Sequence, residues 1–263
     1  MINIIMLKNK LILVTGLASN RSIAYGIASQ LSEHGARLIL TFQNERLQER
    51  MLELIGNLNV VKILPCDVSQ PAQVEYLKQI IEQEFDNRLD GLVHSIAYAP
   101  ADQLQGSFID QVTLEGFNTA HEVSSYSLCA LAQALKQPLI NTQGSIITLT
   151  YLGSERYIPH YNVMGLAKAS LEAAVRYLAA DLGQHQVRVN AISAGPIRTL
   201  AASGIKGLKE MLTHCAEQNL LKRNVDINEI GKVATFLLSS YASPITGEII
   251  FADCGYSKSA MNF

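Results

Sequence analysis

Short aliphatic runs alternate with amphipathic stretches along the whole chain. Each run is nearly continuous in Ile, Leu and Val, a pattern typical of parallel strands that helices cover on both faces. The runs expected to form strands are Leu11–Val14, Arg37–Phe42, Val60–Leu64, Leu89–Ser95, Ser145–Leu149, Val187–Ile192 and Glu248–Phe251. Between them, apolar residues recur at helical spacing and predict helices at Ile23–His34, Glu45–Ile55, Ala72–Phe85, Leu114–Lys136 and Tyr161–Leu182.

Strands that alternate with helices predict βαβ units and a parallel sheet. We therefore expect an α/β fold in which one domain, residues 1–263, contains a doubly wound parallel sheet of about seven strands, of the Rossmann type. The sequence shows no internal repeat and no Pro/Gly/Ser-rich linker. Ligands of such sheets bind at the carboxyl ends of the strands. The weakly patterned stretches 97–112 and 196–225 follow such ends, so both are candidates for segments that cover the site.

Composition and charge exclude several classes of function. The net charge is -2, the pI is about 6.3 and no basic stripe occurs, so nucleic acid is not an expected partner. The four cysteines are scattered without a C-x-x-C pair, which predicts neither a metal site nor a disulfide framework. The chain has no apolar run of transmembrane length, and its apolar start lacks the features of a signal peptide. We expect a cytoplasmic protein with no transmembrane segment.

The first strand leads into a candidate phosphate-binding turn. Gly16 permits a tight turn, and the next helix, with Ser22 as its expected N-cap, offers N–H groups and a positive dipole end to a pyrophosphate. Gly26, inside that helix, is expected to allow close packing against the sheet. The full G-x-G-x-x-G fingerprint is absent, so a plain capped turn remains the alternative.

Two further strand ends carry candidate contacts to a dinucleotide. Gln43 stands where an NAD site usually has an acid that bonds the ribose, and the nearby Arg46 leaves room for NADP. Asp67 has the acceptors for an adenine amine, with Val68 as an apolar contact. Equally, Asp67 could simply start a turn.

The fourth and sixth strands end in segments suited to a nicotinamide. At the fourth, Ser95 and Ile96 precede Ala97, and small residues there let backbone approach a cofactor. After the sixth, Gly195-Pro196 is a rigid turn. Ile197 and Thr199 follow it and could cover the ring and reach the carboxamide and phosphates.

Tyr161 and Lys168 are the most informative candidates for chemistry. They are seven residues apart, which returns a helix nearly to the same face, and Tyr151 lies ten residues upstream. A cation beside a phenol favours the phenolate and suits a proton donor or oxyanion partner. By itself, the pattern also fits an ordinary surface lysine and a half-buried tyrosine.

Together, four motifs resemble the NADH-dependent enoyl-[acyl-carrier-protein] reductases of bacterial type II fatty-acid synthesis, within the short-chain dehydrogenase/reductase superfamily. They are Thr15-Gly16 with Ser22-Ile23-Ala24-Tyr25-Gly26, Tyr151-Leu152-Gly153, Tyr161-Asn162-Val163-Met164-Gly165-Leu166-Ala167-Lys168, and Gly195-Pro196-Ile197-Arg198-Thr199-Leu200-Ala201. The resemblance runs from about Lys8 to Met261. Most of the superfamily has Lys four residues after Tyr, whereas position 165 here is Gly.

The resemblance implies reduction of a trans-2-enoyl thioester, with hydride passing from NADH to C3 and a proton to C2. Tyr161 would bond the thioester oxygen, Lys168 would hold the nicotinamide ribose, and Tyr151 would line the site. Ala99, Tyr151 and Tyr161 would touch substrate. The implied cofactor contacts are Gly16, Ser22, Ile23, Gln43, Asp67, Val68, Ser95, Ile96, Lys168, Ile197, Arg198, Thr199, Leu200 and Ala201.

The resemblance also implies an acyl carrier protein partner, a homotetramer, and a segment within 196–225 that covers the acyl chain. Its apolar residues Leu200, Ile205, Leu208, Met211 and Leu212 suit a lipid tail, or else belong to the core of an ordinary helix. Two positions depart from the family pattern. Ala97 replaces a Gly beside the nicotinamide, and Cys254 replaces a Gly in the C-terminal turn. We expect a negative φ at Cys254, because a positive φ there would be strained.

Two rival functions remain. A carbonyl reductase of the same fold would need Lys four residues after Tyr and a Ser at the end of the fifth strand. Thr150 could replace that Ser, but Gly165 cannot replace the Lys. A cofactor-binding scaffold without chemistry would have no need for Tyr151, Tyr161 and Lys168 together.

Overall fold

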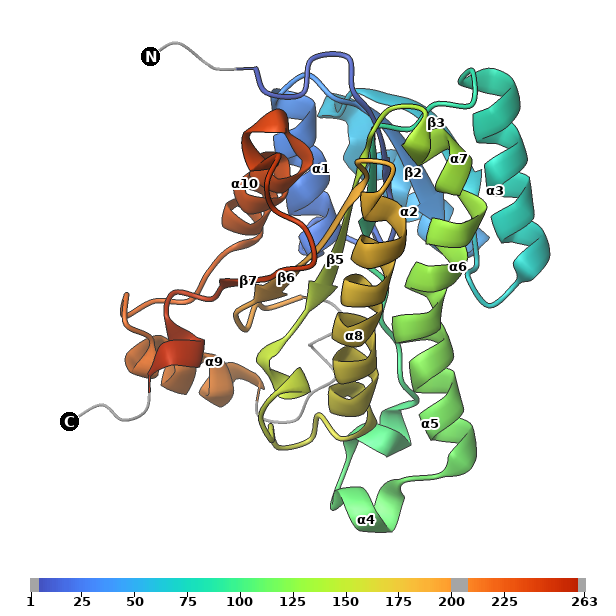
Figure 1. Cartoon of the computed structure of the whole chain (residues 1–263). Coiled ribbons are helices and arrows are strands. Elements are labelled where there is room, and N and C mark those ends of the chain that lie inside the picture. Colours follow the sequence, from blue (N-terminus) through green and yellow to red (C-terminus); the bar gives the residue numbers. More distant parts are fainter. Residues whose placement is uncertain (1–4, 200–207, 260–263) are drawn as a thin grey trace.

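A seven-stranded parallel sheet forms the centre of the computed structural model, which describes residues 5–199 and 208–259 (Figure 1). The strand order is β3-β2-β1-β4-β5-β6-β7. Their bounds are β1 Leu11–Val14, β2 Arg37–Phe42, β3 Val60–Pro65, β4 Gly91–His94, β5 Ser145–Thr150, β6 Arg188–Ala194 and β7 Ile249–Ala252. The expected doubly wound sheet is confirmed, and β4 is shorter at both ends than its aliphatic run suggested.

Helices cover both faces of this sheet. Their bounds are α1 Ile23–Glu33, α2 Glu45–Leu54, α3 Pro71–Glu84, α4 Phe108–Gln111, α5 Leu114–His121, α6 Ser127–Ala134, α7 Lys136–Ile140, α8 Val163–Gly183, α9 Leu208–Gln218 and α10 Ile227–Leu238. The cores follow the alternation of strand side chains. Ile12 and Val14 pack with α1 and α10, whereas Leu11 and Leu13 pack with α3, α6 and α8 on the other face.

Two expected helices differ from the structure. The stretch predicted as Leu114–Lys136 is divided by a π-helical turn, Glu122–Tyr126, between α5 and α6. The helix predicted to begin at Tyr161 begins at Val163. The reason is Asn162, whose φ of 38° and ψ of -120° are far from helical values, so Tyr161 lies outside the helix.

The strand order reverses between β1 and β4, which are neighbours although two strands separate them in sequence. This is the point of a doubly wound sheet where a ligand crevice opens at the carboxyl ends. Helix α1 follows β1 there, and its other side lies along α10 (Figure 1). A Cβ atom on Gly26 would lie 2.3 Å from the carbonyl oxygen of Ile227. Gly26 therefore packs against α10, not against the sheet as expected.

No helix of the described residues is both long and apolar enough to cross a membrane. Within the same ranges, no group of three or more His, Cys, Asp or Glu side chains is arranged to hold a metal ion.

Candidate active site

Gly16 and Ser95 bring the ends of β1 and β4 into close contact. Gly16 has φ 81°, and a Cβ atom on it would lie 1.9 Å from the carbonyl oxygen of Ser95. Only glycine fits this position, both for its left-handed backbone and for its lack of a side chain. The floor of the crevice is therefore bare backbone, which lets a ligand approach the N-terminus of α1. Ile96 continues the chain beside it and is half-buried.

Ser22 caps α1 as expected, since its Oγ accepts a hydrogen bond from the N–H of Tyr25 at 3.3 Å. Its hydroxyl donates to the carbonyl oxygen of Ser19 at 2.6 Å. The hydroxyl hydrogen thus points into the turn, and the N–H groups of the first helical turn are the donors left for an anion. Ile23 is half-buried and packs on the α1 side of the sheet.

Gln43 and Asp67 meet at the ends of β2 and β3. The Gln43 amide donates to Asp67 Oδ2 at 3.2 Å, while Asp67 Oδ1 accepts from the N–H and the hydroxyl of Ser69. Burial raises the pKa of Asp67, but the Ser69 and Gln43 hydrogen bonds outweigh it, so the pKa lies below its usual value. Asp67 therefore starts a turn and also faces Gln43. Val68 is half-buried against the α3 side.

Residues 197–199 extend from the end of β6. Ile197 is half-buried, Arg198 is exposed and Thr199 is half-buried. Leu200, Ala201 and Ile205, which complete the expected cofactor and acyl-chain contacts, lie outside the described residues.

Tyr161 occupies a short segment of unusual backbone between β5 and α8. His160 and Asn162 on either side of it both have positive φ, 62° and 38°. Such conformations cost a non-glycine residue on the order of 1–3 kcal/mol and are common at active sites. The Tyr161 ring packs against a small cluster that includes Ala99 and Met164. Ala99 is thus buried beside Tyr161.

Tyr151 and Tyr161 share one site. Their ring centroids are 5.2 Å apart, with the rings inclined at 75°. Burial raises the pKa of the Tyr151 phenol, and Tyr256, Cys215 and Tyr161 add to this effect. Burial also raises the pKa of Tyr161, with a further contribution from the charge of Glu172. Both phenols are therefore neutral hydrogen-bond donors at physiological pH.

Lys168 is a buried cation on the first turns of α8. Its ammonium group donates to the carbonyl oxygen of Leu149 at 2.8 Å. Burial lowers the pKa of Lys168 to about 8, against the opposing effect of Glu172. The expectation that a cation would favour the Tyr161 phenolate is wrong for this arrangement. Burial has the largest effect on the pKa of Tyr161. The Lys168 ammonium group donates instead to the Leu149 carbonyl oxygen of β5.

Gly153 and Gly165 account for the absence of a lysine four residues after Tyr161. A Cβ atom on Gly153 would lie 2.4 Å from Cδ1 of Tyr161, and one on Gly165 would lie 2.7 Å from the carbonyl oxygen of Gly153. The loop after β5 contacts both the Tyr161 ring and α8. These contacts leave no room for a side chain at position 153 or 165. A lysine at position 165 would therefore collide with the loop.

Thr150, the last residue of β5, is bonded to a side chain of α8. It is buried, and its hydroxyl donates to Glu172 Oε1 at 2.6 Å. Its hydroxyl hydrogen is thereby directed towards α8. Sequence reasoning considered Thr150 only as a substitute for a catalytic serine and missed Glu172, although a glutamate one helical turn after Lys168 was the available signal.

His94 is a second buried polar residue that the sequence left unassigned. Its Nδ1 lies 2.8 Å from Thr148 Oγ1, and its Nε2 lies 2.8 Å from Ser127 Oγ. Burial, assisted by the charge of Lys168, lowers the pKa of His94 to about 3. The neutral ring joins β4 to β5 and to the start of α6, directly after the π-helical turn.

Helix α9 and the C-terminal turn approach the same tyrosines. Buried Cys215 of α9 forms a hydrogen bond with Tyr256, and both groups raise the pKa of Tyr151. Burial is the main reason that the pKa of Tyr256 is raised to about 12. Cys254 in this turn has φ 57°, so the expected negative φ is wrong. The Cys254 carbonyl accepts from the N–H of Leu221, and this bond fixes the turn against the loop after α9.

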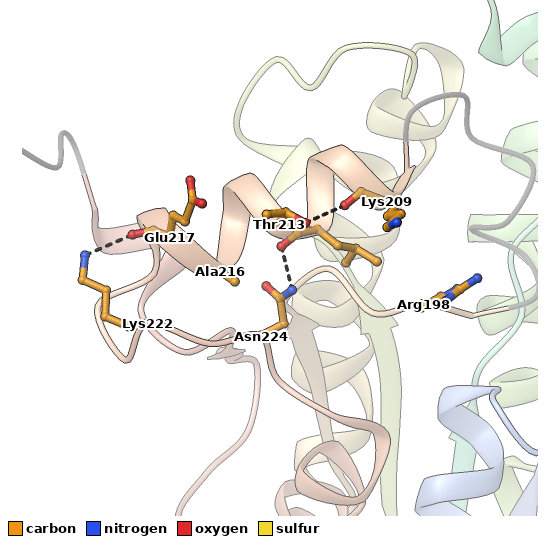
Figure 2. Close-up of a pocket in the computed structure, with 8 residues that line it drawn as sticks. Arg198, Lys209, Thr213, Ala216, Glu217, Lys222 and Asn224 are labelled. Carbon is orange, nitrogen blue, oxygen red and sulfur yellow. Dashed lines mark hydrogen bonds between the residues drawn. The ribbon is translucent and has the colours of Figure 1, made fainter.

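A pocket of about 750 Å³ lies along α9 (Figure 2). Its lining is Arg198, Lys209, Leu212, Thr213, Ala216, Glu217, Lys222 and Asn224. The Asn224 amide donates to the Leu212 carbonyl oxygen at 2.8 Å and holds the following loop to the helix. Neither tyrosine nor Lys168 lines this pocket, so the pocket is distinct from the tyrosine pair.

Known proteins resemble this chain over nearly its whole length. A family model described as enoyl-(acyl carrier protein) reductase matches residues 16–257. A Haemophilus influenzae protein named enoyl-[acyl-carrier-protein] reductase [NADH] is 51% identical, covering 97% of each chain. An Escherichia coli protein of the same name is 49% identical at the same coverage.

Solved structures give the same result. The Aquifex aeolicus enoyl-[acyl-carrier-protein] reductase (NADH) has a TM-score of 0.93 and is 42% identical, covering 97% of this chain and 99% of its own. A Bacillus cereus enoyl-acyl carrier protein reductase, solved with NADP+ and indole naphthyridinone, has a TM-score of 0.94 and is 44% identical at the same coverage.

Proposed function

Because the chain belongs to the enoyl-(acyl carrier protein) reductase family, we propose that it reduces the trans-2 double bond of enoyl thioesters carried by acyl carrier protein, using NADH. This is the final reductive step of the fatty-acid elongation cycle. The observation that carries the proposal is the Tyr151–Tyr161 pair, two neutral phenols whose ring centroids are 5.2 Å apart, with Tyr151 directly after β5 and Tyr161 just before α8.

The crevice at the β1–β4 switch suits a dinucleotide. Gly16 leaves bare backbone where a Cβ atom would collide with Ser95, and the N-terminus of α1 faces the same place. Gln43 and Asp67 would bind the adenosine end, Ser95, Ile96 and Lys168 the nicotinamide end, and residues 197–201 its carboxamide and phosphates. Bound there, NADH supplies the hydride that C3 of the substrate accepts.

Tyr161 would donate a hydrogen bond to the thioester oxygen as negative charge develops on it. A raised pKa suits this role, because the phenol stays protonated and available as a donor at neutral pH. One preorganised donor of this kind is worth about 3 kcal/mol in the transition state. Tyr151 would line the acyl side of the site, with Ala99 behind Tyr161. Lys168 would hold the ribose and keep the local potential positive.

Segment 196–225, which contains α9, would cover the acyl chain. The proposal is supported by Cys215 of α9, which forms a hydrogen bond with Tyr256 and, like Tyr256, raises the pKa of Tyr151. We also propose a cytoplasmic homotetramer, following the family resemblance. The exposed apolar side chains Tyr126 of the π-helical turn and Leu166 and Tyr177 of α8 are available to a second copy of the chain.

A carbonyl reductase is disfavoured by two positions. Gly165 contacts the Gly153 backbone and leaves no room for a lysine four residues after Tyr161. Thr150 donates its hydroxyl hydrogen to Glu172 and cannot also donate to a substrate carbonyl.

The test follows nicotinamide absorbance with purified protein, a trans-2-enoyl thioester or a 3-oxoacyl thioester, and NADH or NADPH. We expect NADH to be oxidised with the enoyl substrate only. Turnover of the 3-oxoacyl substrate would establish the carbonyl reductase instead. Binding of NADH without turnover of either substrate would establish the scaffold.

A further inference from the structure

Glu172 is a buried acid beside the proposed active site, and nothing in the proposed reaction uses it. Its exposed fraction is 7%, and it lies on α8 one turn after Lys168. An isolated charge at such a depth is costly unless it is hydrogen-bonded or balanced by an opposite charge. The carboxylate therefore needs a structural or functional explanation.

Two hydrogen bonds tie the end of β5 to α8 at this point. Lys168 donates to the Leu149 carbonyl oxygen at 2.8 Å, and Thr150 donates to Glu172 Oε1 at 2.6 Å. Leu149 and Thr150 are consecutive, and Tyr151 follows them directly. A cation and an anion of one helix thus hold the two residues from which Tyr151 extends.

The same carboxylate acts on the site through its charge. Lys168 and Glu172 are not in direct ion-pair contact in the described chain, yet the charge of Glu172 opposes the loss of the Lys168 proton and disfavours ionisation of Tyr161. Among the described residues, His94 on β4 is also coupled to Lys168, and burial keeps it neutral. Thr150 of β5 and Ser193 of β6, its partner in the sheet, carry no charge. Glu172 is therefore the counter-charge of Lys168.

We propose that Glu172 is a positioning residue of the reductase site, which fixes the end of β5 through Thr150 and is the counter-charge of Lys168 one turn earlier on α8. This inference rests on the proposed function for the meaning of Lys168, but its electrostatic part can be measured without turnover.

The experiment compares Glu172→Gln, Thr150→Val and the exposed control Glu53→Gln in the full-length protein. Lysine labelled with ¹³C at Cε reports protonation by NMR, and the Lys168 resonance is assigned by its loss in Lys168→Arg. We expect a wild-type midpoint near pH 8. In Glu172→Gln it should fall by about one pH unit, because an opposite charge one helical turn away has been removed. It should be unchanged in Thr150→Val and Glu53→Gln.

Kinetics provide the second measurement. In Glu172→Gln, the alkaline limb of kcat/KM for NADH oxidation should move to lower pH by the same interval, with activity recovering on acidification. Thr150→Val should lower kcat by a constant factor across pH while leaving KM for NADH unchanged. Glu53→Gln should match the wild type in both measurements.

Several results would overturn the inference. An unchanged Lys168 midpoint in Glu172→Gln refutes the electrostatic role, and an unchanged kcat in Thr150→Val refutes the positioning role. If Glu172→Gln fails to fold, Glu172→Asp replaces it. Asp keeps the charge, so the Lys168 midpoint should remain near the wild-type value, and a midpoint that falls by a full unit contradicts the proposal. A wild type that does not reduce the enoyl thioester refutes the proposed function, and the NMR titration then decides the role of Glu172 alone.

Discussion

The Cα of Gly153 faces the ring of Tyr161 so closely that an added Cβ atom would lie 2.4 Å from Cδ1 and 2.7 Å from Cε1. The loop after β5 therefore sets the position of the phenol from behind, while Gly165 holds the loop against α8. These contacts restrict the Tyr161 ring to one position, although the Tyr161 backbone lies outside α8.

Gly153→Ala should displace the Tyr161 ring and lower kcat by about 100-fold, because a shift of about 1 Å in a catalytic group has that cost. Binding of NADH, measured by fluorescence titration, should be unchanged. Gly183→Ala is the matched control, since a Cβ atom there meets nothing within 4 Å. Wild-type kcat in Gly153→Ala would show that the ring is not held from behind.

Tyr161→Phe should retain NADH binding and lose roughly 100- to 1000-fold in kcat, the usual cost of one oxyanion donor. The measurement is steady-state oxidation of NADH with an enoyl thioester. Tyr157→Phe removes a hydroxyl from a side chain that is 82% exposed in the neighbouring loop, and it should behave as the wild type. Equal rates for the two variants would remove Tyr161 from the reaction.

Lys168→Met should abolish activity and change how stability depends on pH. The pKa of Lys168 is lowered by burial from 10.5 to about 8. Between these values the unfolded chain binds more protons than the folded one, so wild-type stability rises with pH across this window. The melting temperature of Lys168→Met relative to the wild type should therefore be highest below pH 8 and fall towards pH 10.5. Melting temperatures from pH 7 to 10.5 test this, with exposed Lys232→Met as the charge-loss control. A difference in melting temperature that does not change with pH would show that the pKa of Lys168 is not lowered in the folded protein.

His94→Gln should lose stability at pH 7, where the two imidazole hydrogen bonds are broken, and show a smaller loss in acid. The pKa of His94 is lowered from 6.5 to about 3. Between these pH values the imidazole is neutral in the folded protein and protonated in the unfolded chain. Wild-type stability therefore falls as pH drops below 6.5, by on the order of 2–3 kcal/mol at pH 4.5 from this residue alone. Urea unfolding at pH 7 and 4.5 gives the difference. If the difference in unfolding free energy between variant and wild type is not smaller at pH 4.5 than at pH 7, the His94 imidazole is not held neutral in the folded protein.

The strands and most helices follow from sequence because their determinants are local. Aliphatic runs such as Ser145–Leu149 can be buried on both faces only inside a covered sheet. Ser22 caps α1 by accepting a hydrogen bond from the N–H of Tyr25, three residues later. The meeting of Gln43 with Asp67 could be foreseen only in outline, since it depends on β2 and β3 being neighbours.

The features that sequence reasoning missed depend on backbone geometry or on tertiary contacts. Asn162 moves the start of α8 from the predicted Tyr161 to Val163 through a conformation that no periodicity reveals. Cys254 adopts a positive φ because the surrounding turn, fixed by the Asp253 carboxylate and the bond to Leu221, determines its backbone. Glu172 and Thr150 are 22 residues apart, and only the packing of α8 on β5 brings them together.

The contact of α1 with α10 has a mechanical consequence. A Cβ atom on Gly231 would lie 2.4 Å from the carbonyl oxygen of Gly26, and one on Gly26 would meet Ile227, so the two backbones touch directly. Helix α10 begins at a capping box, Asp226 with Glu229, immediately after the loop that leaves α9. At this crossing, backbone atoms set the distance between the helices, and the Gln30 side chain lies beside Gly231. We therefore expect a movement of α9 that shifts the start of α10 to displace α1, whose N-terminus lies at the β1–β4 crevice.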